Sequence, residues 1–224
     1  MKSRTLSMLS LAALAFLVVG AGGCIFSPDS DDGGPGTGPG PDPYPFAGTE
    51  DQLMANFKTA YDEMDRNVYV DDVLYDEFHF VFTEGSPYAP AGGWDRGAEV
   101  ESVTSMFAGN AGWDEVAGVS KAGVQDISFS QLLRLNDWED VPLNDPVFPG
   151  ARKALYDVEI VFYLDTGSNT ITVAGQQLFY VMSEQVEVDG VMKTRWRLFG
   201  QTDLSADGKA NEAMTWSIVK VLYR

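Results

Sequence analysis

One segment of alternating side chains constrains the fold of this chain more than any other feature. Apolar side chains stand at every second position of this segment: Tyr156, Val158, Ile160, Phe162 and Leu164. Because successive side chains of a β-strand point to opposite faces, this alternation predicts a strand with one apolar face. A sheet with one apolar face must be covered by a second layer, so the chain has to supply helices or another sheet.

More strands are predicted on both sides of this segment. The predicted strands span residues 78–82, 127–135, 156–164, 170–186, 191–202 and 214–223. The pair Asp189-Gly190 between two of them is typical of a two-residue hairpin turn, which requires positive φ angles. The pattern therefore predicts one early strand followed by about five antiparallel strands.

Three helices are predicted in the N-terminal half. Residues 49–52 form a capping box that opens the first helix, with Thr49 as its N-cap. A short second helix is expected over residues 71–76, and a third begins after Asp95 and ends at Gly109. The predicted fold class is α+β, with three N-terminal helices packed on a curved antiparallel sheet of about six strands.

This order of elements resembles the nuclear transport factor 2-like (SnoaL-like) superfamily. The residues that carry the resemblance are Phe57, Ala60-Tyr61, Asp76-Glu77-Phe78-His79-Phe80, Trp94-Asp95-Arg96, Met106-Phe107, Trp196, Asp203 and Thr215-Trp216-Ser217. The resemblance covers residues 47–224. It implies a cone-shaped half-barrel with a pocket between helices and sheet, and a possible homodimer through the outer sheet face. It does not imply one activity, because the superfamily includes isomerases, dehydratases, cyclases and binding proteins.

The sequence offers two candidates for catalysis, His79 and Glu84. The steroid isomerase branch, which the chain resembles in element order, implies a tyrosine on the first helix and a carboxylate after the first strand. Phe57 stands at the tyrosine position and cannot donate a hydrogen bond to an oxyanion, while Glu84 is the acid nearest the carboxylate position. His79 is the only imidazole, and it is either a general base facing the pocket or a strand residue on the face opposite Phe78 and Phe80.

Two further patterns are interpreted as structural. Asp157 and Glu159 share one face of a strand, and they are expected on its solvated face because the other face is apolar. Ser217 and Lys220 match an S-x-x-K motif. On the predicted strand these two positions point to opposite faces, so the match is interpreted as accidental.

The candidate ligand-binding residues are Trp94 and Trp196. Three loops are expected, over residues 84–93, 110–126 and 136–151, and Trp94 lies at the end of the first. Tryptophans in or beside such loops can form a binding rim, or they can pack locally onto the core.

The first 24 residues have the pattern of a secretory leader. Lys2 and Arg4 precede an apolar stretch over residues 11–19, and three small residues then lead into Cys24. This end resembles the lipobox of bacterial lipoproteins, which implies a signal peptide over residues 1–23 and lipidation of Cys24. The residues after the cysteine are Ile25 and Phe26 rather than aspartate, which by the same resemblance indicates the outer membrane of the cell envelope.

The segment 24–46 is predicted to be a lipidated cysteine followed by a disordered tether. Glycine and proline supply 11 of the 20 residues in 27–46, so this part cannot bury enough apolar area to fold. The folded domain is then expected over residues 47–224.

Composition excludes several kinds of partner. The chain has 33 acidic and 15 basic residues, and such a surface repels nucleic acid. One cysteine and one histidine cannot build a four-ligand zinc site, and neither a metal nor a cofactor is predicted. The sequence thus predicts a lipid-anchored envelope protein whose domain binds a small apolar ligand or an envelope partner without catalysis. The alternative is a cavity enzyme of the isomerase, dehydratase or cyclase kind.

Overall fold

The computed structural model describes residues 42–224, with the exception of positions 84, 91–92, 165–168 and 205–213. The described residues belong to one compact unit. The predicted leader, Cys24, nearly all of the tether and Glu84 lie outside the described residues.

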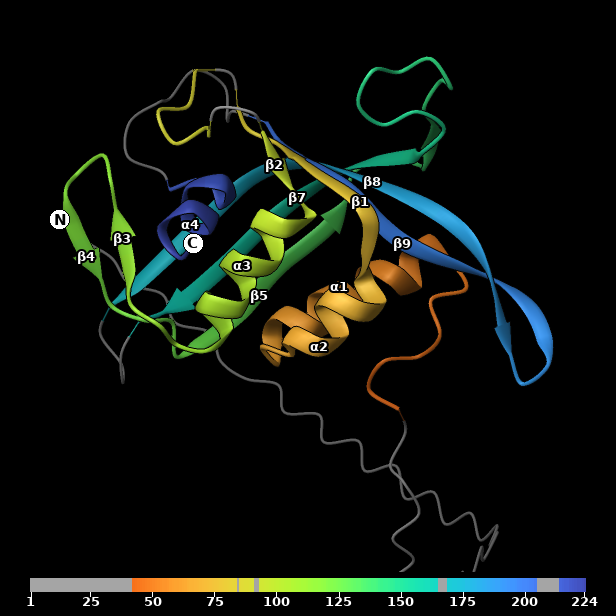
Figure 1. Ribbon diagram of the computed structural model, residues 1–224, viewed down its shortest axis with the longest axis horizontal. Coiled ribbons are helices and arrows are strands. Elements are labelled where there is room, and N and C mark those ends of the chain that lie inside the picture. The colour runs from red at the N-terminus through yellow and green to blue at the C-terminus, as the bar shows by residue number, and fades with distance from the viewer. Residues whose placement is uncertain (1–41, 84, 91–92, 165–168, 205–213) are drawn as a thin grey trace, which may run out of the picture. The chain divides into compact units, whose positions relative to one another are not determined.

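The fold is α+β, with one large sheet, a separate hairpin and a few helices (Figure 1). The helical elements are α1 (Glu50–Asp62), α2 (Arg66–Val68), the π-helical turn η1 (Tyr69–Val73), α3 (Arg96–Phe107) and α4 (Trp216–Leu222). The strands are β1 (Leu74–Val81), β2 (Trp94–Asp95), β3 (Gly112–Asp114), β4 (Val119–Lys121), β5 (Asp126–Arg134), β6 (Glu139–Asp140), β7 (Arg152–Tyr163), β8 (Thr170–Val188) and β9 (Val191–Asp203). The large sheet is open and has the order β2-β1-β9-β8-β7-β5, with β6 also paired to β7, while β3 and β4 form the separate hairpin.

The prediction of a wholly antiparallel sheet is wrong, because β1 runs parallel to β9. Leu74 of β1 pairs with Leu198 of β9, residues that are distant in the sequence. The alternation of apolar residues predicts that a strand exists but not its direction, which here is set by this long-range pairing.

The prediction of three N-terminal helices is also wrong. The first and third predicted helices correspond to α1 and α3, but residues 71–76 do not form the predicted second helix. Tyr69–Val73 is a single π-helical turn, and β1 already begins at Leu74, four residues earlier than predicted. Both Val73 and Leu74 are buried, so the chain enters the sheet where their apolar side chains reach the core.

The last predicted strand, over residues 214–223, is instead the helix α4. Its β-branched residues favour a strand by propensity, but tertiary contacts support the helix. The Thr215 hydroxyl accepts from the Ile218 amide, and the buried Asp203 carboxylate accepts from the Ser217 amide. These bonds satisfy amides that have no partner inside the first turn of a helix.

Several local predictions are confirmed. The hydroxyl of Thr49 accepts from the amide of Gln52 at the start of α1, and the carboxylate of Asp95 accepts from the amide of Ala98 at the start of α3. The β8–β9 turn has φ angles of 55° at Asp189 and 75° at Gly190, as the predicted hairpin requires. The Gln52 amide nitrogen donates to the Asn56 side-chain oxygen, one turn further along α1.

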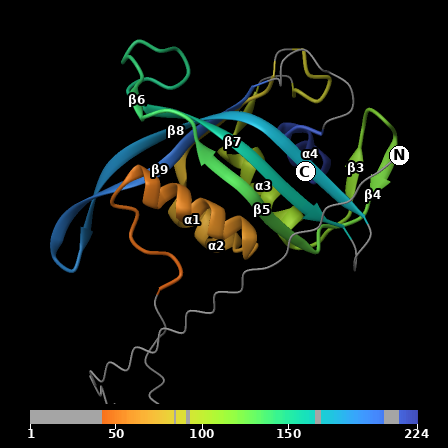
Figure 2. The ribbon, with the colours of Figure 1, turned by 180° about the vertical axis from the view of Figure 1, so that it is seen from behind.

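The core lies between the helices and one face of the sheet, where α1 and α3 cover the strands (Figures 1 and 2). The opposite face carries a second, smaller cluster made by Val141, Phe148, Ala151 and Phe199. The Phe148 ring stacks on Tyr180, with 3.8 Å between ring centroids. A Cβ atom at Gly200 would overlap Phe148, so the glycine allows this ring to lie directly on the sheet. The 141–151 loop therefore covers part of the face for which a homodimer is predicted.

Candidate functional site

The space in which the resemblance implies a pocket is filled by aromatic side chains. Phe57 lies at its centre and is fully buried. Its ring centroid lies 5.1 to 6.0 Å from those of five other rings: Tyr61, Tyr69, Phe129, Phe179 and Trp216. Rings at such distances are in contact with one another, so the protein's own side chains fill the space that a ligand would occupy.

A buried ion pair adjoins this aromatic core. Lys220 of α4 and Glu99 of α3 both have side chains with 0% exposure. The Lys220 ammonium donates to both Glu99 carboxylate oxygens, at 2.7 and 2.8 Å, and to the Gln201 amide oxygen at 2.8 Å. Burial lowers the pKa of Lys220, against the opposing effect of the Glu99 charge.

Glu99 has two further donors. The Tyr69 hydroxyl donates to one carboxylate oxygen at 2.7 Å, and the Trp94 indole donates to the other at 2.9 Å. Burial and the negative charge of Glu99 raise the pKa of Tyr69. The carboxylate is thus surrounded by donors, which is the condition under which a buried charge is tolerated.

Asp203 forms a second buried polar group beside the first. Its carboxylate accepts from the Gln177 side chain and from the Ser217 amide, each at 2.9 Å. Burial raises the pKa of Asp203, and this effect exceeds that of the bonds from Ser217, which lower it. A carboxyl group of this kind can exchange a proton closer to neutral pH than an exposed one.

Two buried amide atoms of the residues that bond Asp203 and Lys220 have no hydrogen-bond partner within the described part of the chain. They are Gln177 Oε1 and Gln201 Nε2. Buried polar atoms usually have a protein or water partner, so each of these two amides is suited to a bound water.

The predicted ligand-binding residues do not lie together. Trp94 is 2% exposed and belongs to the core, whereas Trp196 is half-buried. The Trp196 ring lies 5.9 Å from the Arg152 guanidinium, and its backbone amide donates to Ala47. Trp94 therefore packs onto the core and does not form part of a binding rim.

His79, Asp157 and Glu159 lie on the faces of their strands that point away from the core, as their structural interpretation predicts. His79 is exposed on the face opposite Phe78 and Phe80. Glu159 is exposed and Asp157 half-buried, and they bond to side chains of the neighbouring strand β5. Of the two catalytic candidates, the structure thus describes only His79, and its imidazole is outside the interior.

The reason for dismissing the S-x-x-K match is wrong, because Ser217 and Lys220 lie on a helix. Both are fully buried, but they have different partners. The Ser217 hydroxyl lies 2.8 Å from that of Thr215, while Lys220 is held by Glu99 and Gln201. The sequence did contain one signal for the buried pair, since Lys220 interrupts an otherwise apolar run over residues 218–222.

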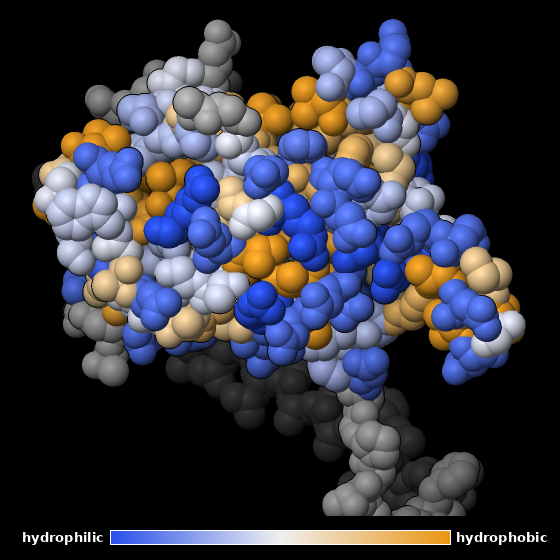
Figure 3. Space-filling view, in the orientation of Figure 1, coloured by the Kyte–Doolittle hydropathy of each residue, from blue (hydrophilic) through white to orange (hydrophobic). Residues whose placement is uncertain are grey.

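The surface offers an open groove and several exposed apolar groups. The groove, of about 610 Å³, runs along α3 and is lined by Asp95, Gly97, Ala98, Val100, Glu101, Thr104, Ser105, Asn110 and Arg224. Apolar side chains are exposed on the β3–β4 hairpin, on the loop between β6 and β7, and at the β8–β9 turn (Figure 3). The most exposed members are Trp113, Val116, Leu143, Val191 and Met192.

None of the protein-family models, curated proteins or solved structures compared with this chain matches it. Within the described residues, no helix has the length and apolar character that a membrane span requires.

Proposed function

We propose that this chain is a lipoprotein of the bacterial cell envelope, held by an acylated Cys24, whose folded domain binds a protein partner without catalysis. The observation that carries the choice of partner is the filled interior around Phe57. A pocket for a small ligand typically has a volume of about 300–1,000 Å³, whereas this space holds packed rings. Helices on one face of a curved sheet support kinship with the nuclear transport factor 2-like superfamily, which remains part of the proposal.

The β3–β4 hairpin is the surface best suited to a protein partner. It exposes 53% of Trp113 and 58% of Val116. Asp114 stabilises the hairpin, accepting from the Tyr88 hydroxyl at 3.1 Å and pairing with Lys121 at 3.7 Å. Tryptophan is enriched among the few residues that dominate binding energy in protein interfaces.

Membrane attachment is tested by replacing Cys24 with alanine. We expect the variant to leave the membrane fraction, because the acyl chains of a lipoprotein supply its anchoring. Fractionation of cells followed by immunoblotting measures the distribution. A variant that stays in the membrane fraction would count against the anchor.

Partner binding is tested by placing a photo-reactive phenylalanine derivative at position 113 of the full-length chain in the cells that make it. We expect irradiation to yield one discrete adduct with another envelope protein. The matched control places the same group at Glu139, which is exposed on β6, and should give no such adduct. Equal labelling at both positions, or none at Trp113, contradicts the hairpin as the binding surface.

The enzyme alternative is supported by one observation, the buried Lys220–Glu99 pair with unpaired polar atoms beside it. Proton-transfer chemistry there needs a substrate that reaches Lys220. In native reductive methylation we expect Lys220 to stay unmodified while exposed Lys193 is fully methylated. Peptide mass spectrometry reads out both sites, and methylation of the two at similar rates would favour the enzyme.

A further inference from the structure

The β8–β9 hairpin extends beyond the rest of the sheet. β7 pairs with β8 only as far as Val181, and β1 pairs with β9 only from Leu198 onward. Residues 182–197 therefore form a two-stranded arm in which each strand is paired with the other (Figure 1). A two-stranded ribbon is marginally stable by itself, so an arm of this length needs further contacts.

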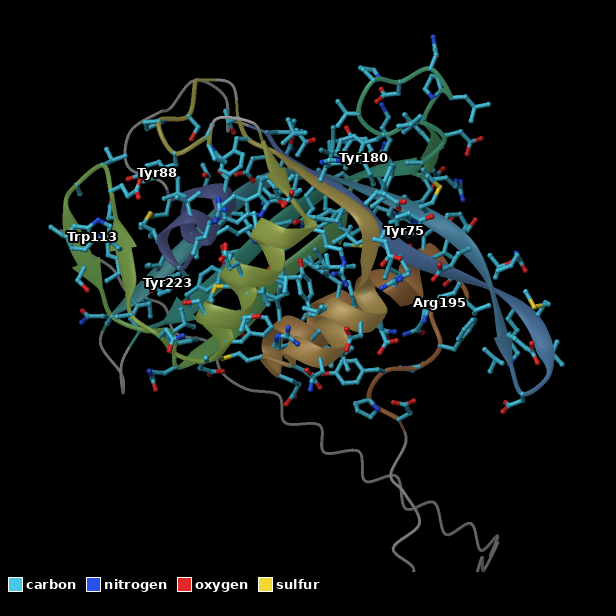
Figure 4. The ribbon with its side chains drawn as sticks, viewed as in Figure 1. Tyr75, Tyr88, Trp113, Tyr180, Arg195 and Tyr223 are labelled. Atoms are coloured by element: carbon cyan, nitrogen blue, oxygen red, sulfur yellow. The ribbon has the colours of Figure 1, made fainter. Side chains whose placement is uncertain are left out.

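The base of the arm is fastened to the segment through which the chain enters the domain. The Trp196 amide donates to the Ala47 carbonyl at 2.9 Å. Arg195 donates to Glu184 across the arm and lies 3.6 Å from Asp72 (Figure 4). The bond from Trp196 thus joins the arm to the entry segment, and the pair with Asp72 joins it to η1.

The end of the arm and the entry segment both expose apolar side chains. Val191 is 57% exposed, Met192 59% and Phe46 40%. The ammonium of Lys193, the residue after Met192, lies 5.7 Å from the centroid of the Phe46 ring, so the two segments approach each other there. Figure 3 shows apolar surface along the arm, away from the body of the domain.

The entry point also limits how far the domain can be from its anchor. Residues 25–41 join Cys24 to the described domain, and this stretch spans at most about 60 Å when fully extended. A connection of this length keeps Phe46 within reach of the membrane whenever Cys24 is acylated, and such a tether makes even a weak contact effective.

We propose that the tip of the arm, formed by Val191 and Met192 together with Phe46, rests in the lipid surface to which Cys24 is attached. The inference depends on the proposed lipid anchor. The domain is strongly acidic, so the contact depends on apolar side chains entering the interfacial region and not on attraction to anionic headgroups. The β3–β4 hairpin lies at the opposite end of the domain in both ribbon views (Figures 1 and 2), so the same orientation turns Trp113 away from the membrane.

The test uses the full lipidated protein, in which acylation of the sole cysteine leaves no free thiol. A cysteine introduced by Met192→Cys is labelled with an environment-sensitive fluorophore, and the protein is reconstituted in phosphatidylcholine vesicles with and without brominated acyl chains. We expect loss of fluorescence with the brominated lipid. The controls, Leu143→Cys and Val116→Cys, place the label at exposed positions away from the arm and should keep their fluorescence.

Each outcome is informative. A floated protein whose label at position 192 is not quenched overturns the membrane contact but leaves the anchor intact, and quenching at Leu143 or Val116 instead overturns it in favour of another face. Quenching that increases with phosphatidylglycerol would indicate attraction through Lys193 and overturn the apolar mode. Failure of the protein to float with the vesicles overturns the lipid anchor and the contact together.

Discussion

Replacing Lys220 with methionine is expected to lower the free energy of unfolding by about 3–5 kcal/mol. The substitution removes the ammonium group that lies 2.7 and 2.8 Å from the two Glu99 oxygens and leaves that carboxylate buried without its countercharge. Urea unfolding measures the effect, with each variant made in a Cys24→Ser background so that the protein is soluble without acylation.

The double variant Lys220→Met/Glu99→Gln separates the charge effect from the loss of packing. The glutamine oxygen can still accept from the Trp94 indole, and its amide nitrogen can donate to the Tyr69 hydroxyl oxygen, so we expect most of the lost stability to return. Lys193→Met, at an exposed lysine, should change stability by less than about 0.5 kcal/mol. A double variant as unstable as the single one would show that the unpaired Glu99 charge is not the cause.

Replacing Phe57 with alanine is expected to cost about 3–5 kcal/mol of stability, as other large-to-small changes in protein cores do. Phe57 is fully buried, and its ring contacts those of Tyr61, Phe179 and Trp216 among others. The same urea experiment measures the loss. Leu143→Ala is the matched control, because Leu143 is 86% exposed and its truncation removes no core contact.

The Phe57→Ala variant also tests whether the interior is full. An apolar cavity left in a core stays dry and binds small apolar molecules such as benzene. We therefore expect benzene to raise the melting temperature of the variant and to leave that of the parent protein unchanged. A parent protein that benzene stabilises equally would already contain such a cavity, and the small-ligand function would then be favoured over a protein partner.

The proposed membrane contact and the proposed partner-binding surface lie at opposite ends of the domain. Lys193 of the β8–β9 arm approaches Phe46 of the entry segment, while the β3–β4 hairpin, which exposes Trp113, lies at the other end of the domain (Figure 1). A tether at one end and a binding surface at the other would let the domain reach a partner in the envelope without losing its lipid attachment.

Features that depend on neighbours in the sequence could be predicted from it. The N-caps at Thr49 and Asp95 need only a side-chain oxygen three residues before an amide, and the turn at Asp189-Gly190 needs only residues that tolerate positive φ. The face of the strand that carries Asp157 and Glu159 followed from alternation with its apolar face. The exposure of His79 was one of two alternatives that alternation left open.

Only the tertiary structure decided the features that depend on residues distant in the sequence. By local propensity the segment of Lys220 resembles a strand, yet it is a helix whose first turn is capped by Asp203 and whose lysine meets Glu99 on another helix. The direction of β1 depends on pairing with β9, and the filling of the expected pocket depends on rings from α1, η1, β5, β8 and α4. Alternation and capping patterns in the sequence predict which way a side chain points. Burial and charge pairing arise only when segments that are distant in the sequence come into contact.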